Sequence, residues 1–195
     1  GGAADDFLAG GLGNDEFVRS AGADTIDLGD AGSIDLITGG VGTPTLDLSD
    51  KSVPVTVFVK DDRILVGFGE QNTSTATILA SAFTFTDLAS LTAQFGTAFE
   101  HIVGVTDASN VAEIVGTAEA DIFHVQETTS ALILDGGVEA DTYFFYADPT
   151  GANPITVTVD DVGENLKDEN VINVVGSGSA DEILVTGDFA DGGTI

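Results

Sequence analysis

Aspartates recur at a nearly constant spacing in the first 47 residues, and their carboxylates are the groups of this chain best suited to chemistry. Residues 1–47 can be written in rows of nine, with two additional residues, Leu28 and Gly29, before the fourth row. The sixth position of the five rows reads Asp6, Asp15, Asp24, Asp35 and Pro44. The eighth position is always apolar: Leu8, Phe17, Ile26, Ile37 and Leu46. A carboxylate and an apolar side chain two residues apart therefore repeat along this region.

The repeat predicts a turn and a short strand in each row. An apolar residue two positions after an Asp fits a strand that points one side chain inward, and the glycine-rich half of the row supplies an unhindered turn. Two rows then form one coil of an all-β, right-handed parallel β-roll or β-helix solenoid, in which alternate rows stack. Stacked carboxylates repel one another unless a hard cation lies between the turns. Oxygen-only ligation with flexible geometry suits Ca²⁺.

The rows resemble the nonapeptide GGxGxDxUx of repeats-in-toxin (RTX) proteins, the haemolysin-type calcium-binding β-roll. Residues 10–18, GGLGNDEFV, match this pattern at every defined position, and residues 1–9, GGAADDFLA, depart from it only at Ala4. The resemblance implies that sixth-position carboxylates and turn carbonyls hold the Ca²⁺. The implied pairs are Asp6 with Asp24 and Asp15 with Asp35, and the implied turn glycines are Gly1, Gly10, Gly11, Gly13 and Gly22.

Two features leave alternatives open for these aspartates. The Leu28–Gly29 insertion falls between Asp15 and Asp35, so the register of that pair stays open. The aspartates could also serve only to form turns, because Asp is a common turn residue without any metal.

The period breaks after Leu46, and we expect three regions. These are an RTX-like nonapeptide β-roll block over 1–47, a non-repeat β-rich linker over 48–98 and a degenerate repeat β-solenoid block over 99–195. In the linker, residues 53–60 and 63–68 are predicted strands, separated by a charged turn at residues 61–62. Residues 76–85 are predicted to form another strand, and residues 87–95 a short helix with Asp87 as N-cap.

A degenerate form of the motif returns in the last block. Residues 116–124, 136–144 and 176–184 place Asp121, Asp141 and Asp181 at the sixth position. Because 20 and 40 residues separate these rows, their turns need not stack as the N-terminal ones do. Their fourth positions are not glycine, and positive φ is unfavourable for other residues. We expect either further Ca²⁺ ligation by these three aspartates or structural turns beneath a solvated acidic face.

Composition excludes several classes of function. The chain has 33 Asp and Glu against 5 Lys and Arg, a formal charge of −28, so it lacks the basic footprint that nucleic acid binding needs. Apolar residues make up 43% of the chain, too many for a disordered acidic tail. The absence of Cys excludes thiolate metal sites, and we expect no membrane span. Both ends look cut, which suggests a fragment of a large bacterial exoprotein.

Motifs for catalysis are scarce. The histidines are His101 and His124, and neither lies near a nucleophile elbow, so both are more simply strand residues. Phosphate-cradling, dinucleotide-binding and zinc-protease motifs are missing from the sequence. We therefore predict that the chain is not an enzyme. Paired carboxylates for sugar chemistry stay open as an alternative, because some polysaccharide-degrading enzymes are β-helices with acidic clefts.

The predicted function is a calcium-binding structural module of a secreted or cell-surface bacterial protein, such as an adhesin or haemolysin-like exoprotein. It would fold on binding Ca²⁺ after export. The expected partners are calcium ions, and a cell-surface or polysaccharide ligand stays open. One alternative is a carbohydrate-binding or polysaccharide-degrading β-helix module. Another is that the acidity is a salt adaptation without a specific role for Ca²⁺.

Overall fold

The apolar eighth position of each N-terminal row lies in a short strand. The computed structural model describes residues 3–22, 24–28, 33–39, 45–60, 62–108, 111–126, 128, 130–147, 157–160 and 170–176. The five rows give β1 (Phe7–Ala9), β2 (Glu16–Arg19), β3 (Thr25–Asp27), β4 (Ile34–Gly39) and β5 (Thr45–Asp47). Phe17, Ile37 and Leu46 are buried, and Leu8 and Ile26 pack against the same core. The strand prediction for these rows is confirmed.

The rest of the described chain adds nine strands and two helices. The strands are β6 (Val55–Lys60), β7 (Arg63–Phe68), β8 (His101–Val105), β9 (Glu113–Val115), β10 (Ile122–Val125), β11 (Leu132–Asp135), β12 (Thr142–Tyr146), β13 (Val157–Val159) and β14 (Val171–Val175). The helices are α1 (Thr75–Ala80) and α2 (Leu88–Phe95).

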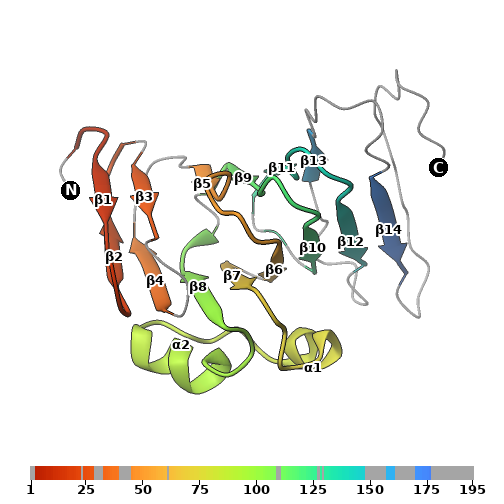
Figure 1. The fold of residues 1–195 in the computed structure, drawn as a ribbon, viewed down its shortest axis with the longest axis horizontal. Helices are drawn as coiled ribbons and strands as arrows, with labels where there is room; N and C mark the ends of the chain where they lie inside the picture. The colour runs from red at the N-terminus through yellow and green to blue at the C-terminus, as the bar shows by residue number, and fades with distance from the viewer. Residues whose placement is uncertain are drawn as a thin grey trace.

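These strands form three sheets within the described residues. The largest has eight strands in the order β14-β12-β10-β6-β7-β8-β4-β2, the second has four in the order β13-β11-β9-β5, and β1 pairs with β3. The four-stranded sheet lies along one face of the eight-stranded sheet, while α1 and α2 lie along the other (Figure 1). β1 and β2 lie at one end of the long axis and β14 at the other. The eight-stranded sheet takes strands from all three predicted regions.

The predicted right-handed parallel β-roll or β-helix solenoid is wrong. The central sheet is mixed, because β7 runs antiparallel to both β6 and β8. For β6 and β7 the physical reason is that only two residues connect Lys60 to Arg63, since a parallel connection needs a crossover of roughly a dozen residues or more. Helices also replace part of the predicted strand content. The described part of the molecule is mostly β, with three sheets.

The helical segment corrects one prediction and confirms another. Residues 76–85 do not form a strand, because α1 begins after the N-cap Ser74, whose side chain accepts a hydrogen bond from the Thr77 N–H. The helix predicted over residues 87–95 is present as α2, with Asp87 as its N-cap in a capping box with Ser90. In the described part of the chain, neither helix has the length and apolarity needed to cross a membrane.

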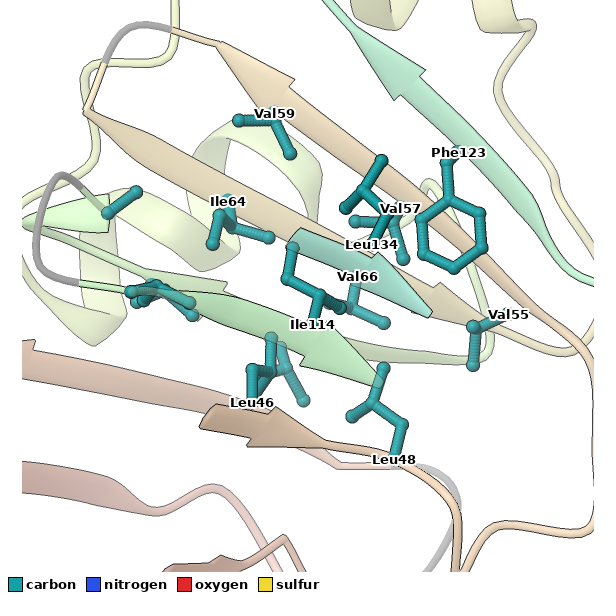
Figure 2. Packing of buried hydrophobic residues seen from close by; sticks show 14 of the residues in the cluster. Leu46, Leu48, Val55, Val57, Val59, Ile64, Val66, Ile114, Phe123 and Leu134 are labelled. Atoms are coloured by element: carbon teal, nitrogen blue, oxygen red, sulfur yellow. The ribbon is translucent and has the colours of Figure 1, made fainter. Parts of the chain in front are cut away.

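The eight-stranded sheet is buried on both faces near its centre. Alternating residues of β6 divide between two cores: Val57 faces the four-stranded sheet, whereas Phe58 faces the helices. Figure 2 shows the first core, where Leu46, Ile114 and Leu134 pack against β6 and β7. Burial on both faces explains why residues 55–59 and 64–66 are almost continuously apolar. This double-sided core holds the turns that carry the aspartates.

Candidate functional site

Asp6 and Asp24 are brought together by the parallel pairing of β1 with β3. Each precedes its strand by one residue, and Phe7 lies opposite Thr25 in the register. The Asp6 N–H donates to Asp24 Oδ1 at 3.1 Å, and the Thr25 N–H donates to the Asp6 carbonyl at 2.9 Å. The predicted stacking of this pair is therefore present.

Asp15 and Asp35 make the same contact where β2 pairs with β4. The Asp15 N–H donates to Asp35 Oδ1 at 2.9 Å, and the Leu36 N–H donates to the Asp15 carbonyl at 2.9 Å. The separation in sequence is 20 residues here and 18 residues for the first pair. The two additional residues in the sequence therefore do not break the register of this pair. Asp6 with Asp24 and Asp15 with Asp35 are called the N-terminal pairs below.

The C-terminal aspartates also stack, although their sequence spacing left this open. The Asp121 N–H donates to Asp141 Oδ1 at 2.7 Å, and the Asp141 N–H donates to Asn170 Oδ1 at 2.7 Å. On its other side, Asp121 Oδ1 accepts the Val55 N–H at 2.8 Å. Asp121, Asp141 and Asn170 are called the C-terminal ladder below. Asp181 and Gly1 lie outside the described residues.

Asp121 is held by more donors than a turn requires. Besides the Val55 N–H, its carboxylate accepts the Thr117 N–H at 2.6 Å and the Thr117 hydroxyl at 3.0 Å. Burial raises the pKa of Asp121 to about 6, and the hydrogen bonds from Thr117 and Val55 act in the opposite direction. This carboxylate therefore works as a buried hub for backbone N–H groups.

First-position glycines make room for the carboxylates of their own rows. A Cβ at Gly10 would lie 2.3 Å from Asp15 Oδ2, and one at Gly136 would lie 2.0 Å from Asp141 Oδ2. Gly22 has φ of +125°, and a Cβ there would lie 2.6 Å from the Ala4 carbonyl oxygen, so both conformation and space require glycine. Gly11 and Gly13 also have positive φ, at the tip of the turn that precedes Asp15.

The carboxylate oxygens of the N-terminal pairs could supply some of the ligands that a hard cation needs. Asp15 Oδ2 is buried with no hydrogen-bond partner. Asp24 Oδ1 and Oδ2 each accept one backbone N–H, from Asp6 and Ser20, and a carboxylate has about four lone-pair sites. Among the described residues, however, no group of three or more His, Cys, Asp or Glu side chains is arranged to hold a metal. A bound ion would therefore also need backbone carbonyls as ligands.

A Ser, a His and an Asp meet at a place that the sequence does not indicate. His101 Nε2 lies 3.1 Å from Ser33 Oγ and 3.2 Å from Asp35 Oδ2. All three residues are at most 3% exposed, and Phe68 stacks on the imidazole ring. Both partners contact the same ring nitrogen, whereas a nucleophilic relay needs one partner at each nitrogen. This cluster therefore anchors Asp35 and does not have the geometry of a catalytic triad.

His124 belongs to a stack of rings on β6, β10 and β12. Its ring lies 4.9 Å from that of Phe58 and 4.8 Å from that of Phe144, measured between centroids, and Nδ1 lies 2.9 Å from the Tyr146 hydroxyl. Burial lowers the pKa of His124 to about 4, so the ring is neutral at pH 7. Tyr143, on the other face of β12, is fully buried against Phe123. These rings stack on one another and contribute to packing.

Comparison of the chain with family models, with curated proteins and with solved structures finds no match. The resemblance to the RTX nonapeptide therefore stays a prediction from the residues alone.

Proposed function

We propose that this chain is a calcium-binding structural module of a secreted or cell-surface bacterial protein. The N-terminal pairs would hold Ca²⁺ through their carboxylates together with backbone carbonyls of the glycine-rich turns. The observation that carries the proposal is the stacking of Asp6 on Asp24 and of Asp15 on Asp35, in rows that resemble the RTX nonapeptide.

Electrostatics supports a cation at these pairs. Each pair places two carboxylates on adjacent strands of a chain whose formal charge is −28, and like charges at close range destabilise the folded state. The buried Asp15 Oδ2 has no hydrogen-bond partner, and coordination to a bound ion would satisfy such an atom. Oxygen donors from carboxylates and carbonyls are the ligands that Ca²⁺ prefers.

The C-terminal ladder is less suited to this role. Asp121 already accepts three hydrogen bonds, from Val55 and Thr117. The next step of the ladder uses Asn170, whose neutral amide oxygen accepts the Asp141 N–H. A position that Asn can occupy needs an acceptor and no charge. We therefore assign Asp121 to backbone hydrogen bonding and the calcium role to the N-terminal pairs.

Ion binding would couple to folding by mass action. Extracellular calcium modules bind with dissociation constants of roughly 10⁻⁴ to 10⁻³ M. At ten times the dissociation constant, one site stabilises the folded chain by about 1.4 kcal/mol. Without Ca²⁺, self-repulsion of the acidic chain favours an expanded state, which would help export before folding.

The test is a Ca²⁺ titration followed by far-UV circular dichroism and by the melting temperature, with Mg²⁺ and with NaCl at equal ionic strength. We expect a saturable rise in melting temperature that is specific for Ca²⁺. Two matched variants locate it: Asp24→Asn and Asp121→Asn each keep one accepting oxygen and lose a hydrogen bond from the N–H four residues earlier.

The calcium-induced rise should shrink in Asp24→Asn and persist in Asp121→Asn. An equal rise with NaCl would instead assign the acidity to salt adaptation. Equal calcium responses in the two variants would show that the stacked N-terminal pairs are not the site.

A further inference from the structure

Arg19 lies at the end of β2 and lines a cavity of about 600 Å³ between the sheets. The residue is 6% exposed, and its Nε and Nη2 atoms are buried with no hydrogen-bond partner. A buried polar group without a partner destabilises a protein, and a buried charged group does so more strongly. A bound ligand that supplied acceptors to Arg19 would remove this cost.

The two unpartnered nitrogens define what such a ligand must present. Nε and Nη2 form one edge of the planar guanidinium, and this edge donates two parallel hydrogen bonds to a carboxylate. Burial lowers the pKa of Arg19, while the charges of Asp107 and Asp24 raise it, and an arginine stays protonated at neutral pH. Asp24 cannot readily turn toward this edge, because its oxygens accept the N–H groups of Asp6 and Ser20.

The remaining lining of the cavity has an apolar part and an acidic part. Ile37, Leu46 and Val105 line it and are at most 7% exposed, so they form its inner wall. Asp47 and Asp50 also line it but are exposed, which places them toward solvent. The volume lies within the roughly 300–1,000 Å³ of small-molecule sites.

We propose that this cavity binds an apolar α-amino acid. The carboxylate of the ligand would pair with the Nε and Nη2 edge of Arg19, its side chain would pack on the apolar wall, and its ammonium group would face the acidic side. A simple carboxylate or a phosphate fits less well. The cavity is lined by Asp24, Asp47, Asp50 and Glu113 against Arg19, and Lys51 pairs with Asp50, so the lining stays net negative and favours a ligand that also carries a positive charge. This site rests on Arg19 and needs no bound Ca²⁺, although Asp24 of the N-terminal pairs also lines the cavity.

The probe is L-leucine, added to the 195-residue chain in buffer containing Ca²⁺ and followed by methyl NMR and isothermal titration calorimetry. We expect saturable binding, with shifts at the methyl groups of Ile37, Leu46 and Val105. Two analogues each lack one charge: 4-methylpentanoate lacks the ammonium group and isopentylamine lacks the carboxylate. Both should bind at least about tenfold more weakly than leucine, which is the effect of losing one charge-assisted pair.

Arg19→Lys is the decisive variant, because it keeps the charge and removes the two-pronged edge. It should weaken leucine binding at least about tenfold while the far-UV spectrum stays unchanged. The proposal is overturned if leucine does not saturate the wild-type chain, if its shifts map away from the cavity, or if Arg19→Lys binds equally well. It is also overturned if either analogue equals leucine on the wild-type chain, a comparison that does not depend on the folding of any variant.

Discussion

The N-terminal pairs and the C-terminal ladder share one type of hydrogen bond, but we assign the two regions different roles. In both regions an aspartate N–H donates to a carboxylate or amide oxygen on the next strand. Asp121 accepts three hydrogen bonds, from Val55 and Thr117, and Asp35 likewise has three, with Asp15, Ser33 and His101. Asp15, the partner of Asp35, differs from both because it keeps a buried oxygen without a hydrogen bond. A sixth-position Asp is therefore first a backbone acceptor, and what else it can bind depends on how many donors already surround it.

The largest effect should come from removing the hub of the C-terminal ladder. Asp121→Ala leaves the buried N–H groups of Val55 and Thr117 without acceptors, and each such loss costs about 1–3 kcal/mol. We expect the free energy of unfolding, measured by urea denaturation, to fall by about 2–5 kcal/mol. Asp87→Ala, which removes only a helix cap, serves as a control and should cost about 1 kcal/mol. A smaller loss for Asp121→Ala than for the control would contradict the hub assignment.

The raised pKa of Asp121 predicts a pH effect with a definite sign. Its pKa is about 6 in the folded chain against 3.8 for an ordinary Asp, so the folded chain takes up this proton first as the pH falls. As the pH falls from about 6 to about 4, protonation of Asp121 therefore stabilises the folded state progressively. Burial of His124, with a pKa of about 4 against 6.5, acts oppositely over the same range.

Comparing the wild type with Asp121→Asn isolates the first contribution, because His124 is present in both. The stability advantage of the wild type should grow by about 1–2 kcal/mol from pH 7 to pH 4, the order of magnitude set by about 1.4 kcal/mol per pKa unit. The measurement is urea denaturation at each pH. A difference that stays flat over this range would refute the raised pKa.

Asn170 tests whether the ladder needs an acceptor or a charge. Asn170→Ala removes the acceptor of the Asp141 N–H and should lower the free energy of unfolding by about 1 kcal/mol. Asn170→Asp restores an accepting oxygen and should stay closer to the wild type. Thermal melts of the two variants decide this, and the reverse order would mean that charge governs the position.

The smallest effect on stability is expected at Asp15. Asp15→Asn changes a carboxylate whose Oδ2 makes no hydrogen bond, so the free energy of unfolding in chelator should change by less than about 1 kcal/mol. The response to Ca²⁺ should nevertheless weaken. If this variant were strongly destabilised in chelator, Asp15 would be a structural residue like Asp121, and the contrast between the two regions would disappear.

Local patterns predicted the elements better than the architecture. The spacing of Asp and apolar residues located β1 to β5 and the pairing of Asp6 with Asp24, because each signal lies within one or two rows. The helix α1 was missed because a short apolar run such as residues 76–85 is compatible with either a strand or a helix. The mixed sheet was missed although a connection of only two residues between Lys60 and Arg63 already required an antiparallel pair.

Long-range contacts of the candidate sites gave no signal in the sequence. His101 reaches Asp35 across 66 residues, and no local pattern links the two. Arg19 replaces the leading glycine of its row, so the repeat marked it only as a departure, and its burial beside a cavity depends on the packing of distant strands.

Counting bound Ca²⁺ tests the central contrast most directly. Isothermal titration calorimetry would compare the wild type with Asp15→Asn/Asp24→Asn, which takes one carboxylate from each N-terminal pair, and with Asp121→Asn/Asp141→Asn. We expect the first double variant to lose saturable Ca²⁺ binding and the second, if folded by circular dichroism, to keep the wild-type stoichiometry. Wild-type stoichiometry in the first variant, or no Ca²⁺ binding by the wild-type chain, would contradict this expectation.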